Sequence, residues 1–369
     1  MTRAAILSAF NPEAFKGGIE TFILNLSALL AERNIQVDTH FMSPTPSLKI
    51  EPFPLKTLKN RVPEFLLNCF MLGRAFSKIE KEYDFVISNN FYGLGYFSPR
   101  VKGFNIYHST HAAYADALKG KLQEKDYRDL RYFYGYLGDW LSGRGKVKIA
   151  VSEAVRNELS RYYKYKEVQV VNHGIDTAFF RRMEEPSSLR EKWRIPRDSF
   201  IGIFVGRWEI GKGIDIMEEL IRLHHDIFWI LVIGPSECPL PETDRVRVIR
   251  NTDKADMREL YSLSDFMILP SYYEGFGLAI IEAMSCELPV ICPEVGVARN
   301  LLRFDPMRKL ILPLSGKTEM LREIKQRISL LLKTEDREVI TALGRSIIEK
   351  DYPLDVWKRK MLTALGLAL

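Results

Sequence analysis

The chain has 369 residues, of which 46% are hydrophobic and 27% charged, so we expect two globular domains and exclude disordered, collagen-like and coiled-coil chains. No uncharged apolar run approaches the roughly 20 residues that cross a bilayer, and four cysteines without a C-x-x-C pair argue against a disulfide framework and a zinc site. The net charge of +6 lies in residues 1–180, which hold 24 Lys and Arg against 18 Asp and Glu, whereas residues 181–369 hold 29 of each.

Apolar runs in the first half alternate with amphipathic ones, which is the pattern of α/β units around a parallel sheet. Residues 4–8 predict a β-strand rather than a signal peptide, and the loop 10–18 follows. Apolar residues at helical spacing from Ile19 to Leu30 predict the first helix. Further strands in this half are expected at 85–88, 104–107, 147–151 and 168–171.

The second half of the chain repeats this scheme. Residues 200–205 predict a strand, the glycine-rich loop 206–213 follows, and Ile216 and Leu220 mark the apolar side of the next helix. Residues 353–369 predict a final helix. Further strands in this half are expected at 228–233, 246–249, 266–269 and 290–292.

These elements predict an α/β fold of two similar domains with a cleft between them. The first domain would span residues 1–178 and the second residues 179–350, with the final helix in 351–369. The polar segment 176–199, which contains two prolines, would form the hinge. Because ligands of open α/β sheets bind beyond the carboxyl ends of the strands, the loops that follow strands are the places to look for function.

The segment 270–284, PSYYEGFGLAIIEAM, gives the strongest indication of a site, because it follows an expected strand directly and opens a helix. Gly275 and Gly277 flank Phe276 and allow the backbone to approach a ligand closely. The first helical amides, from Leu278 onward, would then bind an anion. The alternative is that the two glycines only shape a tight turn.

Two carboxylates belong to this segment. Glu274 stands just before the helix and could accept hydrogen bonds from sugar hydroxyls, and Glu282 stands two turns inside it and could bind a vicinal diol such as a ribose. Either glutamate alone could equally be a solvated surface residue.

The loop in 204–213, FVGRWEIGKG, places two cations between glycines after an expected strand. Arg207 can bind phosphate through its planar guanidinium and Lys212 adds a mobile charge, so the loop that begins at Gly206 suits a diphosphate. The alternative is a flexible surface loop. The order of residues is neither a P-loop nor a G-x-G-x-x-G motif, so ATP hydrolysis and dinucleotide-dependent reduction lose their usual support.

Two weaker signals lie in the first half. Gly17 and Gly18 precede the first helix, where they either permit close approach to a phosphate or sugar or simply form a turn. His108 and His111 follow an expected strand, and each is as readily structural as it is a hydrogen-bonding partner of a sugar hydroxyl. Their spacing could also suggest a metal site, but no suitable third ligand lies nearby.

The basic first half also contains two unusual segments. Residues 48–61 are rich in Lys and Pro, and residues 127–140 interleave aromatic residues with Arg128 and Arg131. Such mixtures suit a membrane interface or a glycan platform, and they are equally compatible with ordinary core aromatics. The excess positive charge is either surface scatter or a face for an anionic partner, such as a membrane surface or a phosphorylated acceptor.

Together these segments resemble the retaining glycosyltransferases of family 4, which have the GT-B fold. The resemblance runs from Gly17 and Gly18 through 151–153 and 172–176 to the final helix, and its most specific part is the pair Glu274 and Glu282. It implies two Rossmann-like domains that face each other across a cleft, with the C-terminal helix crossing back to the first domain.

The resemblance also implies a role for each candidate residue. The ribose would be bound by Glu282, the donor sugar by Glu274 with the backbone of 275–278, and the diphosphate by Arg207 and Lys212. The glycine pair of the first domain would close on the donor, and the histidine that the family has in this domain falls on either His108 or His111. The candidate catalytic residues are Glu274, His111, His108, Arg207 and Lys212, and the candidate donor-binding residues are Gly17, Gly18, Gly206, Arg207, Lys212, Glu274, Gly275, Phe276, Gly277, Leu278 and Glu282.

The chain departs from the family pattern in two places. Glu287 and Leu288 stand where the family mostly has Gly before Pro289, and residues 295–300 lack the second Gly and the Glu of a Gly-Gly-x-x-Glu segment. These changes leave the diphosphate site intact and give no basis for naming the donor sugar. Residues 107–136 are in addition similar to the corresponding region of lipopolysaccharide core glucosyltransferases, which act at the inner membrane face.

The function implied by the resemblance is transfer of a hexose, with retention and without a metal, from a UDP- or GDP-linked sugar to a cell-surface glycan or lipid-linked acceptor. Fixed cations and amides would stabilise the departing diphosphate. No further cofactor and no nucleic acid partner are expected, and a cytoplasmic protein, peripheral on the inner membrane face, would serve cell envelope polysaccharide biosynthesis. The alternatives are a non-hydrolysing nucleotide-sugar epimerase and a donor-binding module without turnover.

Overall fold

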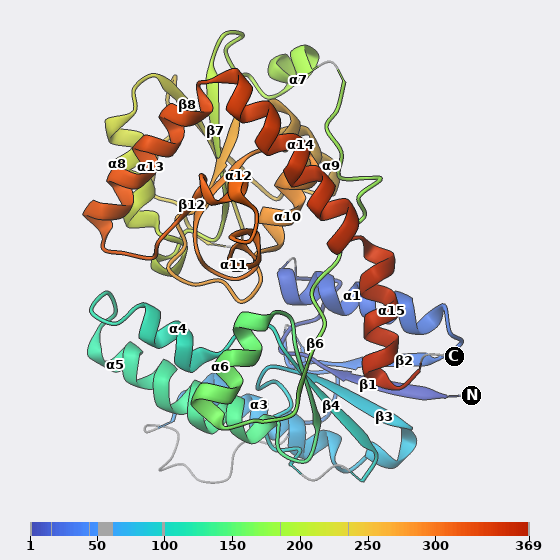
Figure 1. Cartoon of the computed structure of the whole chain (residues 1–369). Coiled ribbons are helices and arrows are strands. Elements are labelled where there is room, and N and C mark those ends of the chain that lie inside the picture. Colours follow the sequence, from blue (N-terminus) through green and yellow to red (C-terminus); the bar gives the residue numbers. More distant parts are fainter. Residues whose placement is uncertain are drawn as a thin grey trace. The chain divides into compact units, whose positions relative to one another are not determined.

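The structure, a computed structural model, describes residues 2–15, 17–43, 45–50, 62–97, 100–184, 186–234 and 236–367. The chain divides into two compact units, each built on one parallel sheet (Figure 1). The first unit comprises Met1–Asn172 and Lys358–Leu369, and the second comprises His173–Trp357. The divisions expected from the sequence lie after residues 178 and 350, and the expected hinge segment 176–199 belongs to the second unit.

The sheet of the first unit has six strands in the order β2-β1-β3-β4-β5-β6. Its five predicted strands are present, and β2 is an additional edge strand whose sequence, QVDTH, is too polar to predict a strand by itself. The strand order reverses direction between β1 and β3, which is the topological switch point, called here the turning point. The strands are β1 (Arg3–Leu7), β2 (Gln36–His40), β3 (Phe85–Asn89), β4 (Lys102–Tyr107), β5 (Val147–Ala150) and β6 (Val168–Val170).

Helices connect these parallel strands and bury their apolar sides against the sheet. The predicted first helix is α1, and Ser152 caps the start of α6 by accepting a hydrogen bond from the amide of Val155 at 3.1 Å. Most of the Lys- and Pro-rich segment 48–61 lies outside the described residues. The helices are α1 (Gly18–Ala31), α3 (Glu64–Phe76), the 3₁₀ turn η1 (Glu80–Glu82), α4 (His111–Ala117), α5 (Glu124–Arg128), the π-helix η2 (Asp129–Trp140) and α6 (Glu153–Tyr163).

The sheet of the second unit has six strands in the order β12-β11-β10-β7-β8-β9. All seven residues of β8 are buried, as expected for a parallel strand covered on both faces. Every predicted strand is present, and the two-residue β12 is additional. The strands are β7 (Phe200–Gly206), β8 (Ile227–Ile233), β9 (Val246–Arg250), β10 (Phe266–Ile268), β11 (Val290–Pro293) and β12 (Ile311–Leu312).

This order is that of a Rossmann sheet, with the turning point between β7 and β10. Helix α9 begins with a capping box in which Asp253 and Asp256 each accept a hydrogen bond from the other's backbone amide. The helices are α7 (Pro186–Lys192), the 3₁₀ turn η3 (Ile210–Lys212), α8 (Ile214–Leu223), α9 (Lys254–Leu263), α10 (Leu278–Ser285), α11 (Ala298–Leu301), α12 (Asp305–Arg308), α13 (Lys317–Leu331) and α14 (Thr334–Asp351).

The final helix, α15 (Leu354–Leu365), begins in the second unit and ends in the first. Lys358 Nζ lies 2.7 Å from Glu32 Oε1 beyond the end of α1, and Lys102 Nζ donates to the carbonyl of Leu365 at 3.3 Å. Met361 on the same helix is fully buried. The two Rossmann-like units and the return of the final helix to the first one confirm the predicted fold class. In the part of the chain that the structure describes, no helix is long and apolar enough to span a membrane.

Candidate functional site

The two strongest sequence motifs meet at the turning point of the second sheet. The loop after β7 carries Lys212 and the loop after its neighbour β10 carries Glu274, and Lys212 Nζ lies 2.7 Å from Glu274 Oε1. Ser271 Oγ donates to the same carboxylate oxygen at 2.8 Å. Glu274 is 9% exposed, and the two donors hold its carboxylate in one place.

The backbones of these two loops are also joined. Tyr272 donates its amide hydrogen to the carbonyl of Gly211 at 3.0 Å. Gly213, at φ +74°, immediately precedes α8, and a Cβ there would come 2.1 Å from the carbonyl oxygen of Pro270. Only glycine fits this approach, so the spacing between the loops is fixed by the main chain as well as by the ion pair.

The turn after β10 ends at Gly277, which has φ +93° and precedes α10 as its N-cap residue, with no side-chain cap. The positive φ explains why glycine stands there, and the uncapped helix start offers amide hydrogens to an anion. Gly275 lies buried in the same turn and Leu278 is the first residue of α10. Phe276 is 4% exposed, so its ring is not available to a ligand.

Arg207 differs from Lys212 in its surroundings. Its side chain is 57% exposed and pairs with Glu209 at 2.9 Å. At Gly206 a Cβ would make only ordinary contacts with Phe204 and Lys212, so no close packing within the chain demands glycine at that position.

Glu282 lies on α10, and Tyr261 of α9 donates its hydroxyl to Glu282 Oε2 at 3.1 Å. Burial raises the pKa of the Glu282 carboxyl, and the hydrogen bond from Tyr261 partly opposes this shift. The carboxyl group is therefore held by a neutral donor and suits hydrogen bonding to hydroxyl groups.

Two residues that support the glycine turn were not identified from the sequence. A Cβ at Gly296 would lie 2.3 Å from the carbonyl oxygen of Phe276, to which the amide of Val297 donates at 2.7 Å. The buried ring of His173 meets the Phe276 ring edge-on at 5.0 Å, and burial lowers the pKa of this histidine to about 4. Gly296 belongs to the segment 295–300 that departs from the family pattern, and the glycine that remains there is the one in this close contact.

In the first unit, Gly17 and Gly18 stand at the start of α1, in the loop that follows β1. A Cβ at Gly17 would lie 2.2 Å from Glu20 Oε2, so a larger residue there would displace this buried carboxylate. A Cβ at Gly18 would meet no atom of the described residues within 4 Å. The two glycines therefore differ in their surroundings: Gly17 faces a carboxylate, and Gly18 faces open space.

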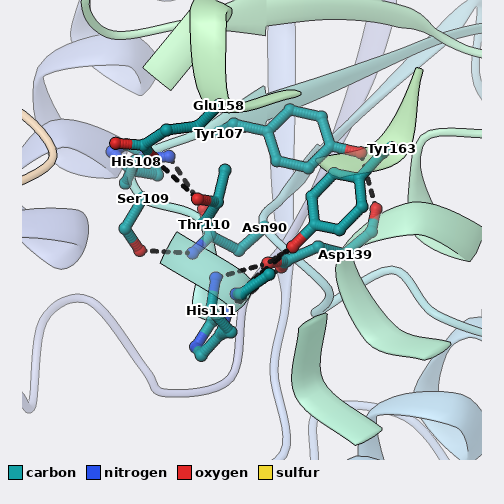
Figure 2. A network of polar contacts seen from close by, with 10 residues as sticks. Asn90, Tyr107, His108, Ser109, Thr110, His111, Asp139, Glu158 and Tyr163 are labelled. Atoms are coloured by element: carbon teal, nitrogen blue, oxygen red, sulfur yellow. Dashed lines mark hydrogen bonds and ion pairs between the residues drawn. The ribbon is translucent and has the colours of Figure 1, made fainter. Parts of the chain in front are cut away.

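The two candidate histidines lie in one polar network after β4, shown in Figure 2. His108 places Nε2 2.9 Å from Asn89 Oδ1 and donates its amide hydrogen to Asn90 Oδ1 at 2.8 Å. His111 is the first residue of α4, and its Nδ1 lies 3.1 Å from Asp139 Oδ2. Asp139 was not identified from the sequence, because nothing in the aromatic segment 127–140 marks one carboxylate as buried.

The structure brings together Lys212, Glu274 and the 275–278 turn in the second unit, and His108 and His111 in the first. Among the described residues, no three His, Cys, Asp or Glu side chains are grouped as a metal site would require. The second unit can thus hold an anion beside carboxylates suited to hydroxyl groups, which is the chemistry of a nucleotide diphosphate sugar.

Comparison with known proteins supports this view. The family model "Glycosyltransferase Family 4" matches residues 16–179, and the model "Glycosyl transferases group 1" matches residues 187–340. The D-inositol 3-phosphate glycosyltransferase of Streptomyces bingchenggensis is 33% identical over 171 residues, which are 40% of this chain and 38% of that protein. The enzyme of the same name from Segniliparus rotundus is 26% identical over 318 residues, 76% of this chain and 70% of that protein. The chain matches about two fifths of the length of the first three curated relatives.

Solved structures share the fold over the whole chain. Sucrose-phosphate synthase from Thermosynechococcus elongatus has a TM-score of 0.77 at 19% identity, covering 99% of this chain and 98% of that one. WaaG, a glycosyltransferase of lipopolysaccharide biosynthesis, has a TM-score of 0.71 at 15% identity, and the match covers 99% of each chain. Anabaena HepE in complex with UDP-glucose has a TM-score of 0.69 at 16% identity, and the match covers 99% of this chain and 100% of that one. With two Rossmann-like units and family matches over 16–179 and 187–340, the chain belongs to the family 4 glycosyltransferases of the GT-B fold.

Proposed function

We propose that the chain transfers a hexose from a nucleotide diphosphate sugar to a cell-surface glycan or a lipid-linked acceptor, with retention and without a metal ion. The observation that carries this proposal is the 2.7 Å ion pair between Lys212 and Glu274, because it places a cation beside the turn that begins α10. A pyrophosphate at that turn would meet the cation and the helix amides together. Glu282 would take the ribose hydroxyls and Glu274 those of the sugar.

Transfer develops positive charge at the anomeric carbon and negative charge on the departing phosphate. Lys212 and the amides at the start of α10 would stabilise that negative charge, because they are in place before the reaction begins, and the exposed Arg207 would add a second cation. With no nucleophile assigned, a same-face displacement is the mechanism that accounts for retention. In it the acceptor oxygen bonds to the anomeric carbon, the bond to phosphate breaks, and the departing phosphate takes the acceptor's proton.

The direct test combines donor binding with turnover. In a thermal-shift screen of UDP-, GDP- and ADP-sugars, the true donor should raise the melting temperature of the chain, since a ligand that binds only the folded state stabilises it. UDP-glucose is the first donor to try, because the fold neighbour HepE binds it. Transfer that survives a chelator would support metal independence, and full loss that only a metal restores would contradict it.

The role of the cation is tested by Lys212→Met, with Arg222→Met as the control, because Arg222 is an exposed cation of the adjoining helix α8. Removing one donor to a developing oxyanion typically lowers kcat by about 10²- to 10³-fold. We expect the donor's thermal shift to change much less. Equal loss of turnover and donor affinity would contradict a role in the transition state.

The same assays separate the two alternatives. A nucleotide-sugar epimerase would convert the donor with no acceptor present, and a binding module would show the thermal shift without turnover. Product that contains both donor hexose and acceptor is expected only of the transferase.

A membrane contact by the first unit is a further part of this proposal. The π-helix exposes Tyr132, Tyr136 and Trp140, whose exposed fractions run from 39% to 54%. Arg131 lies over the Tyr136 ring at 4.9 Å and Arg144 over the Trp140 ring at 5.2 Å. Aromatic rings with cations beside them suit the interface of an anionic bilayer, in agreement with the positive charge of residues 1–180.

Sedimentation with phosphatidylglycerol vesicles tests this contact, with phosphatidylcholine vesicles as the comparison. Tyr132→Ser combined with Trp140→Ser should release the chain from the anionic vesicles. Leu223→Ser, at an equally exposed apolar residue of the second unit, should leave binding unchanged. Equal release by both variants, or no binding by the unaltered chain, would remove the membrane from the proposal.

A further inference from the structure

In the polar network of the first unit, the carboxylate of Asp139 joins His111 and Tyr163 (Figure 2). The Asp139 side chain is fully buried. Its Oδ2 accepts hydrogen bonds from the backbone amide of His111 at 2.7 Å and from the Tyr163 hydroxyl at 3.1 Å, and it lies 3.1 Å from His111 Nδ1. Three donors thus surround one carboxylate oxygen, and a carboxylate oxygen accepts hydrogen bonds.

This acceptor decides which nitrogen of His111 carries a proton. Both carboxylate oxygens lie within 3.2 Å of Nδ1, so Nδ1 must be the donor. In the neutral ring Nε2 is then the acceptor. The ring is also fixed by aromatic contacts, edge-on with Phe91 at 4.9 Å and tilted against Tyr134 at 5.8 Å. The carboxylate therefore sets the tautomer and the aromatic rings set the orientation.

His111 is at the same time partly open. Its side chain is 21% exposed, and Nε2 has no hydrogen-bonding partner among the described residues. His108 differs, because its Nε2 already faces the amide oxygen of Asn89 at 2.9 Å and its ring packs edge-on against Phe22 at 4.8 Å. Of the two histidines left open by the sequence, His111 is the one that presents an oriented acceptor.

The π-helix is what brings Asp139 to this position. π-Helical turns are rare and often occur at functional sites. At Gly135, in the same helix, a Cβ would lie 3.0 Å from the amide nitrogen of Ala112 in α4, so the two helices approach each other closely. One wide helix thus supplies the carboxylate and packs against the helix that begins with His111.

We propose that Asp139 is a positioning residue that holds His111 as the Nδ1–H tautomer, so that Nε2 accepts a hydrogen bond from a hydroxyl group of a sugar substrate. This deepens the proposed function and rests on it for the nature of the substrate. The tautomer itself is a property of the first unit and can be measured without turnover.

The test is ¹⁵N NMR of the full chain with labelled histidine, in which the His111 signals are assigned by their loss in His111→Asn. The two nitrogens of a neutral ring have distinct shifts, so the tautomer is read directly. We expect Nδ1–H in the unaltered chain and a shift toward Nε2–H in Asp139→Asn. The asparagine oxygen can still accept the backbone amide of His111, while its NH₂ would face Nδ1. Tyr163→Phe is the matched control, because it removes one donor and keeps the carboxylate, so the tautomer should stay Nδ1–H.

Turnover gives the second readout. Loss of a carboxylate that orients a metal-binding histidine typically costs about 10- to 100-fold, and by analogy we expect such a fall in kcat for Asp139→Asn with the donor's thermal shift retained. Nε2–H in the unaltered chain, an unchanged tautomer in Asp139→Asn, or unchanged turnover in that variant would each overturn the inference. If the tautomers behave as expected and no sugar donor or acceptor is used by the unaltered chain, the proposed function fails and Asp139 still sets the tautomer.

Discussion

Lys146 allows a quantitative prediction, because it is a cation in the core of the first unit. It is 3% exposed, its Nζ donates to Ser88 Oγ at 3.2 Å, and it lies 5.3 Å from the centre of the Tyr96 ring. Burial lowers the pKa of its ammonium group from 10.5 to about 7. In the unfolded chain the ammonium keeps its proton up to pH 10.5, so between pH 7 and 10.5 the unfolded state binds more protons and stability must rise with pH.

The magnitude follows from these two pKa values. At 1.36 kcal/mol per unit, the cost of Lys146 to the folded state is about 4 kcal/mol at pH 7 and about 1 kcal/mol at pH 9.5. Lys146→Met keeps most of the apolar stem and removes the charge. Ser88 Oγ still donates to the Phe104 carbonyl at 3.1 Å, and the lost hydrogen bond is worth about 1 to 2 kcal/mol. We therefore expect the variant to be more stable than the unaltered chain at pH 7, by about 2 to 3 kcal/mol.

Urea unfolding of both proteins at pH 7 and pH 9.5 measures the effect. The difference in unfolding free energy between variant and unaltered chain should shrink by about 3 kcal/mol over this range, because only the unaltered chain loses the penalty as pH rises. Other titrating groups cancel in this difference. A difference that does not change with pH would refute the reasoning, and so would a variant that is less stable at pH 7.

Three further predictions concern the glycines and the buried histidine. Gly17→Ala should lower the melting temperature of the first unit. Gly18→Ala should melt within a few degrees of the unaltered chain, and its turnover should be lower than that of the unaltered chain. Equal melting temperatures for the two variants would contradict the difference in their surroundings. Because burial lowers the pKa of His173 to about 4, the second unit should lose about 3 kcal/mol as pH falls from 6.5 through 4, and His173→Phe should abolish this loss in acid unfolding. Gly296→Ala should cost about 2 kcal/mol or more and weaken the donor's thermal shift, since its Cβ would strike the carbonyl of Phe276; a variant with normal stability would exclude that contact.

The apolar runs predicted the sheets well because parallel strands are covered on both faces. β8, in which every residue is buried, is the clearest case. The same reasoning failed for β2, an edge strand with alternating polar residues, and for β12, which is only two residues long. Local sequence carries no signal for these strands, because pairing with a neighbour decides them.

The candidate site also has parts that the sequence predicts and parts that depend on the fold. Glycine and charge spacing predicted the loops of Lys212 and Glu274, but the ion pair between them depends on the strand order, which brings β7 beside β10. Asp139 could not be predicted, because a buried acidic residue cannot be told from an exposed one in the sequence alone. Lys146 was hidden for the opposite reason, because lysine is almost never fully buried.

The route of the chain through the two units bears on how each is completed. The second unit is one continuous stretch, His173–Trp357, whereas the first needs residues from both ends of the sequence. As the ribosome makes the chain from its amino end, the second unit has its whole sequence before the first does. Until residues 358–365 emerge, the surface of the first unit that will cover Met361 and Leu365 stays open to solvent or to a chaperone. The unit made first is thus the one finished last.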